Sequence, residues 1–571
     1  MSEDEFRLRV GRIRARGVNG PRTFVGVALA AAARAGGLGR GSGAGAGGFG
    51  AGRAPALSAQ HRLGGSPRRV VVKARVVRQA GRGGALGLHL GYLQREGVTR
   101  EGERGELFGP DGTPAEGAGF AARCAEDRHH FRFIVAPEDA EQMLDLRAFA
   151  RDLMRQAERD LGTSLDWVAV DHWNTAQPHL HILVRGRRDT GEDLVIARDY
   201  IAEGLRARAR ALVTLELGPR SERDIARAHD RDVAAERWTG LDRDLTARVD
   251  RQGLVDVRAD QRSRDPRGLA RLARLRTLAR LGLAGEAAPG RWRLAADAEP
   301  TLRELGQRGD VIARIHRALA TDGRERDLSA YVLDSQSDGL VGRLAGRGLD
   351  DELRGSAYVV IDGLDGRTHH LRLADLADAS DAPPGAIVET RRLERAGGRS
   401  RLVLAVRSDL SLADQVRAPG ATWLDRQLVG RAPAGLGEGG CAEEVREALA
   451  QRTDELVARG LARRAGGRVL FARDLLDGLR RTELDAAAGW LERETGLARL
   501  ALEPEGRVAG IYRQRLDLAS GRFAMIDSGL GFTLVPWRPD LEPHLGREVE
   551  GRANPGGGIV WSFTLKRGLG R

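Results

Sequence analysis

Cysteine and lysine are scarce in this sequence. Only two cysteines, Cys124 and Cys441, stand in 571 residues, so no disulfide framework holds the fold and a reducing, cytoplasmic location is expected. Lysine occurs only at Lys73 and Lys566, so arginine, whose planar guanidinium suits phosphate, carries nearly all the positive charge. No apolar run reaches the roughly 20 residues that a membrane-spanning helix needs, which argues against membrane insertion.

The positive charge is unevenly distributed along the chain. The formal net charge is +12, and residues 1–106 hold 19 basic and 7 acidic side chains, whereas the remaining 73 basic and 73 acidic residues balance. The excess therefore lies in the N-terminal part, as expected for an arm that binds nucleic acid. A basic tail without a nucleic-acid partner is the alternative.

Three histidines lie in a predicted β-hairpin. Residues 167–171 and 180–184 are apolar and β-branched, and the polar residues 174–178 between them predict a turn. His179 and His181 alternate along a strand and share one face, and His172 ends the preceding strand and can reach the same face. Three imidazoles on one surface predict a divalent-metal site with open positions. Ordinary packing of one or two histidines in the sheet is the alternative.

Tyr92 is the candidate nucleophile. It stands in a short helical segment between Gly84 and Gly97, and a tyrosine beside a metal-bound phosphate can attack phosphorus and hold a DNA end covalently. The alternative is that Tyr92 only contributes to the buried face of that helix. Tyr200 is the second candidate, but its segment is more typical of a helix start capped by Asp199.

The spacing of these residues resembles that of a known enzyme family. A His-hydrophobe-His strand, a third histidine seven residues earlier and an upstream Tyr-Leu-x-Arg-x-Gly segment are similar to the relaxases, the mobilisation nucleases or HUH endonucleases of plasmid conjugation. The sequence around these residues is more similar to a subgroup of relaxases in which the relaxase domain is fused to a C-terminal domain of unassigned function. The matching stretches are 169–175, 191–200 and 423–431.

The resemblance covers residues 68–571 and implies a function. It implies a conjugative relaxase that nicks one DNA strand at a transfer origin, forms a 5′-phosphotyrosyl intermediate through Tyr92 and later rejoins the strand. His172, His179 and His181 would hold a divalent ion, Mg²⁺ or Mn²⁺. The implied partners are single-stranded and duplex DNA at the origin, a type IV secretion coupling protein and accessory DNA-binding proteins.

Side chains around the histidines have predicted supporting roles. Many relaxases carry an aspartate two residues after the first histidine, where this chain has Asn174, so Asn174 or Asp171 is expected to orient a ligand. Strand alternation points Asp171 away from His172, which leaves this question open. We also expect six residues to contact DNA, with Trp173 as a stacking platform. They are Arg95, Arg100, His130, Arg132, Trp173 and Arg185.

The fold class expected is α+β. We expect a basic arm at 1–67, an antiparallel-sheet relaxase domain at 68–217 with helices on one face, a charged helical connector at 218–250 and a C-terminal region at 251–571. In that region, two segments with a helix and a Gly-turn hairpin predict winged-helix-like modules, and alternating strands from 357 to 406 predict a small β-barrel.

Other functions remain open from the sequence. A rolling-circle replication initiator or a transposase of the HUH class would use the same histidines and tyrosine on a different substrate. A metal-dependent phosphohydrolase would need the histidines but no tyrosine nucleophile. A DNA-binding protein without nicking activity would need neither the metal site nor the tyrosine.

Overall fold

The computed structural model describes most of the chain. It covers residues 66–563 except 79–82, 96, 176, 264, 322, 325, 395–399, 431–434, 504–505 and 555–557. The predicted arm at 1–67 therefore lies almost entirely outside the described residues. The chain divides into two compact units, 1–298 and 299–571. Among the helices described, none combines the length and hydrophobicity needed to cross a membrane.

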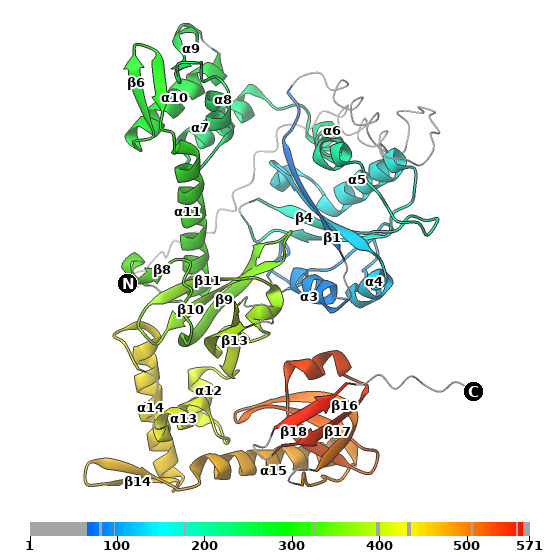
Figure 1. Ribbon diagram of the computed structural model, residues 1–571, viewed down its shortest axis with the longest axis vertical. Coiled ribbons are helices and arrows are strands. Elements are labelled where there is room, and N and C mark those ends of the chain that lie inside the picture. The colour runs from blue at the N-terminus through cyan, green and yellow to red at the C-terminus, as the bar shows by residue number, and fades with distance from the viewer. Residues whose placement is uncertain are drawn as a thin grey trace, which may run out of the picture. The chain divides into compact units, whose positions relative to one another are not determined.

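A four-stranded antiparallel sheet is the centre of the first unit. Its order is β1-β2-β4-β3, and Figure 1 labels β1 and β4 of this sheet. The strands are β1 (Val70–Arg78), β2 (His129–Pro137), β3 (Trp167–His172) and β4 (His179–Arg185). The strands expected at 167–171 and 180–184 are thus confirmed, because each is a short apolar, β-branched run beside a polar turn.

Helices cover both faces of this sheet, so the expectation of one free face is wrong. One face packs on α5 (Leu146–Leu161) and α6 (Leu205–Leu217). The other face packs Val168, Val170 and Leu183 against α3 (Gly83–Leu93) and α4 (Gly117–Cys124). Strand alternation places the three histidines on this second face, beside α3. The helix that carries Tyr92 therefore packs on the same face of the sheet as the three histidines.

Helix α5 begins after a short turn. Strand β2 extends to Pro137, and a 3₁₀ turn, Ala140–Gln142, follows. The side chain of Asp145 accepts hydrogen bonds from the backbone N–H groups of Arg147 and Ala148 and so caps the helix at Leu146. The helix ends at Gly162, which adopts φ 65°.

The first unit continues into a smaller helical part with a three-stranded sheet of order β5-β7-β6. Its helix α10 is followed directly by a hairpin, as the helix-and-hairpin pattern predicted. The elements are α7 (Glu222–Ala234), α8 (Gly240–Thr246), β5 (Val255–Asp256), α9 (Arg258–Arg262), α10 (Pro266–Arg280), β6 (Ala284–Ala288) and β7 (Arg291–Leu294).

The second unit holds a six-stranded sheet packed on α11 (Ala298–Thr321). Its order is β13-β12-β9-β10-β11-β8, and only β8 and β11 pair in parallel. The strands are β8 (Tyr331–Val332), β9 (Val341–Asp351), β10 (Ser356–Gly363), β11 (Thr368–Leu373), β12 (Ile387–Glu394) and β13 (Ser400–Ser408). In the part described, β13 and β8 are open ends, so the expected barrel is wrong. Alternation predicts strands, but closure depends on tilt and stagger that the pattern does not encode.

A second helix-and-hairpin segment and a five-stranded sheet complete the second unit. The segment comprises α12 (Leu412–Arg417), α13 (Trp423–Val429), α14 (Gly440–Ala458), β14 (Ala462–Ala465) and β15 (Arg468–Phe471). After α15 (Leu475–Thr495), the sheet has the order β18-β17-β16-β19-β20. Its strands are β16 (Arg507–Leu518), β17 (Gly521–Asp527), β18 (Phe532–Pro536), β19 (Glu548–Ala553) and β20 (Ile559–Ser562).

Candidate metal centre

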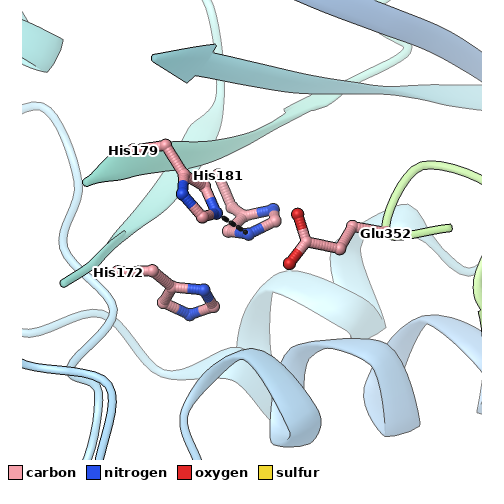
Figure 2. Close-up of side chains that lie close together, drawn as sticks. All are labelled: His172, His179, His181 and Glu352. Carbon is pink, nitrogen blue, oxygen red and sulfur yellow. Dashed lines mark hydrogen bonds between the residues drawn. The ribbon is translucent and has the colours of Figure 1, made fainter. Parts of the chain in front are cut away.

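The β3–β4 hairpin brings the three predicted histidines together. His172 lies directly opposite His179 in the register, and His181 is two residues further along β4 on the same face. The ring centroids of His172 are 5.5 Å from His179 and 4.5 Å from His181, and those of His179 and His181 are 4.9 Å apart. Figure 2 shows the imidazoles turned toward one common space.

The ring nitrogens are spaced as ligands of one ion would be. Nε2 of His179 lies 3.2 Å from Nε2 of His181, and two imidazoles about 2.1 Å from one cation hold their nitrogens roughly 3.0–3.4 Å apart. One nitrogen from each histidine lies within 4.8 Å of the others, so the group can hold a metal ion. Figure 2 also draws Glu352, which belongs to the second unit, and the centre is defined here by the histidines alone.

Backbone carbonyls orient two of the three rings. Nε2 of His172 donates to the carbonyl of Leu93 at 2.8 Å, and Nδ1 of His179 donates to the carbonyl of Gln177 at 3.0 Å. Each bond fixes the tautomer, so Nδ1 of His172 and Nε2 of His179 keep the lone pairs that bind a cation. The ring-orienting role expected of a side chain is therefore filled by the main chain.

The two side chains predicted to orient the histidines do not contact them. Asp171 accepts hydrogen bonds from Nε of Arg147 at 2.9 Å and Nε1 of Trp173 at 2.7 Å, as expected for a side chain on the opposite face of β3. Asn174 is exposed in the turn. We therefore do not assign a supporting role at the metal centre to either residue.

Burial favours the neutral form of His181. Burial lowers the pKa of His181 well below its usual value, and the neighbouring His172 and His179 lower it further because a charged ring there would meet like charges. Neutral imidazoles retain the lone pairs that a cation requires. His181 is thus available as a neutral ligand for a metal ion.

His89 is a fourth imidazole beside the centre, and sequence reasoning missed it. It is buried on α3, three residues before Tyr92 and thus on the same side of that helix. Burial lowers its pKa well below the usual value, and the charges of Arg132, His130 and His172 add to this effect. The i, i+3 spacing from Tyr92 was the available signal in the sequence.

The segment that carries Tyr92 is hydrogen-bonded to the strand that carries His172. Leu93, which follows Tyr92, supplies the carbonyl that accepts from His172, and the backbone N–H of Trp173 donates to the carbonyl of Val98 at 2.7 Å. These bonds join the end of α3 and the loop that follows it to the end of β3. The guanidinium of Arg95 lies over the Tyr92 ring, 4.4 Å from its centroid.

Three of the expected DNA contacts, Arg95, Arg100 and Trp173, lie on the segments that adjoin the centre. The guanidinium of Arg95 lies over the ring of Tyr92, and its positive charge contributes to the lowered pKa of His181. The exposed Arg100 lies over the ring of Trp173 at 4.8 Å. A tryptophan and a guanidinium in contact form a surface on which a base and a phosphate can bind together.

The other expected DNA contacts are engaged within the protein. His130 and Arg132 are buried, and Nε of Arg132 donates to Nε2 of His130 at 3.1 Å. Arg185 forms a two-pronged ion pair with Asp127, with its Nε donating at 2.7 Å. These contacts do not support a role in binding DNA, because binding would require breaking them.

Tyr200 is excluded as the nucleophile by its surroundings. Its side chain is 2% exposed, and its hydroxyl donates to the carboxylate of Asp160 at 2.9 Å. Burial, and then the charge of Asp160, raise the pKa of Tyr200 far above its ordinary value, which disfavours the phenolate. Asp199 makes no side-chain cap, so the predicted capping role is also wrong.

The fold and site define an α+β protein with a candidate trihistidine metal centre on an antiparallel sheet. A family model described as a protein of unknown function (DUF3363) matches residues 271–400 and 391–570, more than half of the chain. The chain belongs to this family. The three histidines of the candidate metal centre, His172, His179 and His181, lie outside the matched residues. No curated protein and no solved structure shows a significant match.

Proposed function

We propose that residues 68–217 nick and rejoin one strand of DNA, with Tyr92 as the nucleophile and three histidines as ligands of Mg²⁺ or Mn²⁺. One observation carries the proposal: the helix that bears Tyr92 ends at Leu93, whose carbonyl accepts from the ligand His172. Nucleophile and ligand are thereby adjacent parts of one hydrogen-bonded structure. The proposal also draws on the resemblance of these residues to relaxases.

The reaction is a phosphoryl transfer between two oxygen atoms. A divalent ion held by the imidazoles would polarise a phosphate oxygen and favour the charge that builds up during attack. The phenolic oxygen of Tyr92 loses its proton and bonds to phosphorus, while the bond from phosphorus to the 3′-oxygen breaks and that oxygen takes up a proton. Arg95, stacked on the ring, stabilises the developing negative charge. The reverse reaction rejoins the strand.

The substrate we propose is a single strand presented at a transfer origin. Tyrosine attack needs an exposed phosphate, and the Arg100–Trp173 pair beside the centre suits an unpaired base with its phosphate. Duplex DNA around the origin, a type IV secretion coupling protein and accessory DNA-binding proteins are proposed partners on the family resemblance alone. A cytoplasmic location would fit these partners.

A covalent-adduct assay tests the proposal. The full chain is incubated with Mn²⁺ and fluorescent single-stranded oligonucleotides that tile candidate transfer origins of the element encoding it. Products are separated on a denaturing gel beside Tyr92→Phe, His179→Ala and the matched control Tyr200→Phe. We expect a protein–DNA band that disappears in the first two variants and persists in Tyr200→Phe.

Other outcomes would favour the alternatives. Cleavage without an adduct would indicate a metal-dependent phosphohydrolase. An adduct on replication-origin or transposon-end hairpins, but not on transfer origins, would indicate a rolling-circle initiator or a transposase. Binding without cleavage of any of these DNAs would indicate a DNA-binding protein that lacks nicking activity.

A further inference from the structure

Two segments of the chain, α10 with the β6–β7 hairpin and α14 with the β14–β15 hairpin, have the same local structure. The similarity begins at the C-terminal end of each helix, where the same backbone hydrogen bonds form. In the first, α10 ends before Gly282 (φ 74°), and the N–H of Leu283 donates to the carbonyl of Leu278 at 2.8 Å. The hairpin then closes on this exit, because the N–H of Ala295 donates to the carbonyl of Leu283 at 2.9 Å.

The second segment repeats each of these bonds. Helix α14 ends before Gly460 (φ 71°), and the N–H of Leu461 donates to the carbonyl of Leu456 at 2.9 Å. The N–H of Ala472 donates to the carbonyl of Leu461 at 3.0 Å, which closes the second hairpin on its helix. The two exits are therefore equivalent residue by residue.

A buried arginine holds the first segment together. Arg274 on α10 is 0% exposed and donates to both oxygens of Asp242, at 2.7 and 2.9 Å. Its remaining N–H groups donate to the backbone carbonyls of residues 233, 235 and 237. Asp242 in turn accepts from the capping residue Thr239.

The second segment has the same buried arginine. Arg452 on α14 is 0% exposed and donates to both oxygens of Asp425, each at 2.8 Å. It also donates to the carbonyls of residues 416, 418 and 420, which are again three alternate positions. Asp425 accepts from the capping residue Thr422. The two segments are thus copies of one module.

The exposed sides of the two equivalent helices carry opposite charges. Helix α10 exposes Arg267, Arg276 and Arg280 and contains no acidic residue, whereas α14 exposes Glu443, Glu447 and Asp454 with Arg446 as its exposed arginine. When Arg274 is matched to Arg452, the exposed Arg276 corresponds to the exposed Asp454. The shared interior and diverged exterior indicate that the copies bind different partners.

We propose that the first copy binds duplex DNA through α10 and the β6–β7 hairpin (Figure 1). Arg276 and Arg280 are exposed on α10, and Arg293 is exposed on the hairpin. A major groove about 12 Å wide admits an α-helix, and guanidinium groups on the helix and the adjacent hairpin can bind phosphates on either side of it. The acidic α14 would repel the same phosphates. This duplex site is separate from the histidine centre and goes beyond the proposed nicking function.

Fluorescence anisotropy with a labelled 30-base-pair duplex of arbitrary sequence tests the proposal. The full chain is titrated in EDTA, so that metal-dependent cleavage cannot contribute, over a range of NaCl concentrations. The variant Arg276→Asp with Arg280→Ala copies the residues of the second module at these positions, and Arg293→Glu is an independent variant on the hairpin. Asp454→Ala is the matched control on α14.

We expect the double variant to bind the duplex roughly 10- to 30-fold more weakly at 0.15 M salt and to reduce the salt slope by nearly 2, as expected for two lost phosphate contacts. Arg293→Glu should weaken binding, and Asp454→Ala should not. Wild-type duplex affinity in both α10 and hairpin variants would overturn the proposal. His179→Ala should bind the duplex normally, because the duplex site does not include the histidine centre. The duplex-binding proposal can therefore hold even if the nicking proposal fails. Loss of duplex binding in His179→Ala would overturn the separate site.

Discussion

Replacing Arg274 with methionine should unfold the first module locally. Arg274 and Asp242 are both buried, and removal of one partner from such a pair costs about 3–5 kcal/mol because the other charge is left uncompensated. Three backbone carbonyls also lose their donor, each at a further cost of about 1 kcal/mol or more. The total of about 6 kcal/mol or more is comparable to the stability of a whole domain, roughly 5–15 kcal/mol.

Hydrogen–deuterium exchange measures this effect in place. Amide protection in α10 should fall by roughly four orders of magnitude in Arg274→Met. Protection in α14 should be unchanged, because that helix has its own Arg452–Asp425 pair. Arg276→Met, exposed two residues away, is the control and should leave α10 protected. The reasoning would be refuted if exchange in Arg274→Met stayed within about tenfold of wild type.

Three further predictions concern other parts of the structure. Burial raises the pKa of Glu444, but hydrogen bonds from Arg343 outweigh this and hold it at about 2. The ionised carboxylate therefore stabilises the fold fully at pH values above 4.5, the ordinary pKa of a glutamate side chain. This stabilisation is lost as the pH falls toward 2. The difference in Tm between wild type and Glu444→Gln should shrink over that range, and a constant difference would contradict the pairing. Tyr200→Phe removes the hydrogen bond to Asp160 and should lower stability by about 1 kcal/mol in urea unfolding while DNA cleavage is retained. Asp145→Ala removes the cap of α5 and should cost about 1 kcal/mol, and an unchanged Tm would count against that cap.

The histidine cluster was predictable because its determinants are local. Strand alternation places His179 and His181 on one face, and a short turn fixes the register that brings His172 opposite His179. The bond from His172 to the carbonyl of Leu93 joins residues 79 positions apart, and no pattern in the sequence encodes it. The assignment of ring orientation to Asp171 or Asn174 failed because a backbone carbonyl took that role.

The remaining differences also arise from tertiary contacts. The burial of Tyr200 depends on side chains of α5 and β4, which its own segment does not reveal, so that segment alone was typical of a helix start capped by Asp199. Arg185 looked free for DNA because its partner Asp127 lies 58 positions away. The repeat of the helix-and-hairpin pattern was visible in the sequence, but the equivalence of Arg274 and Arg452 required their buried contacts.

The most direct test of the account is Mn²⁺ binding by isothermal titration calorimetry. The wild-type chain should bind one ion at the histidine centre, and His172→Ala, His179→Ala and His181→Ala should each weaken binding at least about 100-fold, since loss of even an outer partner costs roughly 10- to 100-fold. His130→Ala, a buried histidine outside the cluster, should bind normally. Equal affinity in the wild type and all three ligand variants would contradict the metal centre and, with it, the proposed chemistry of Tyr92.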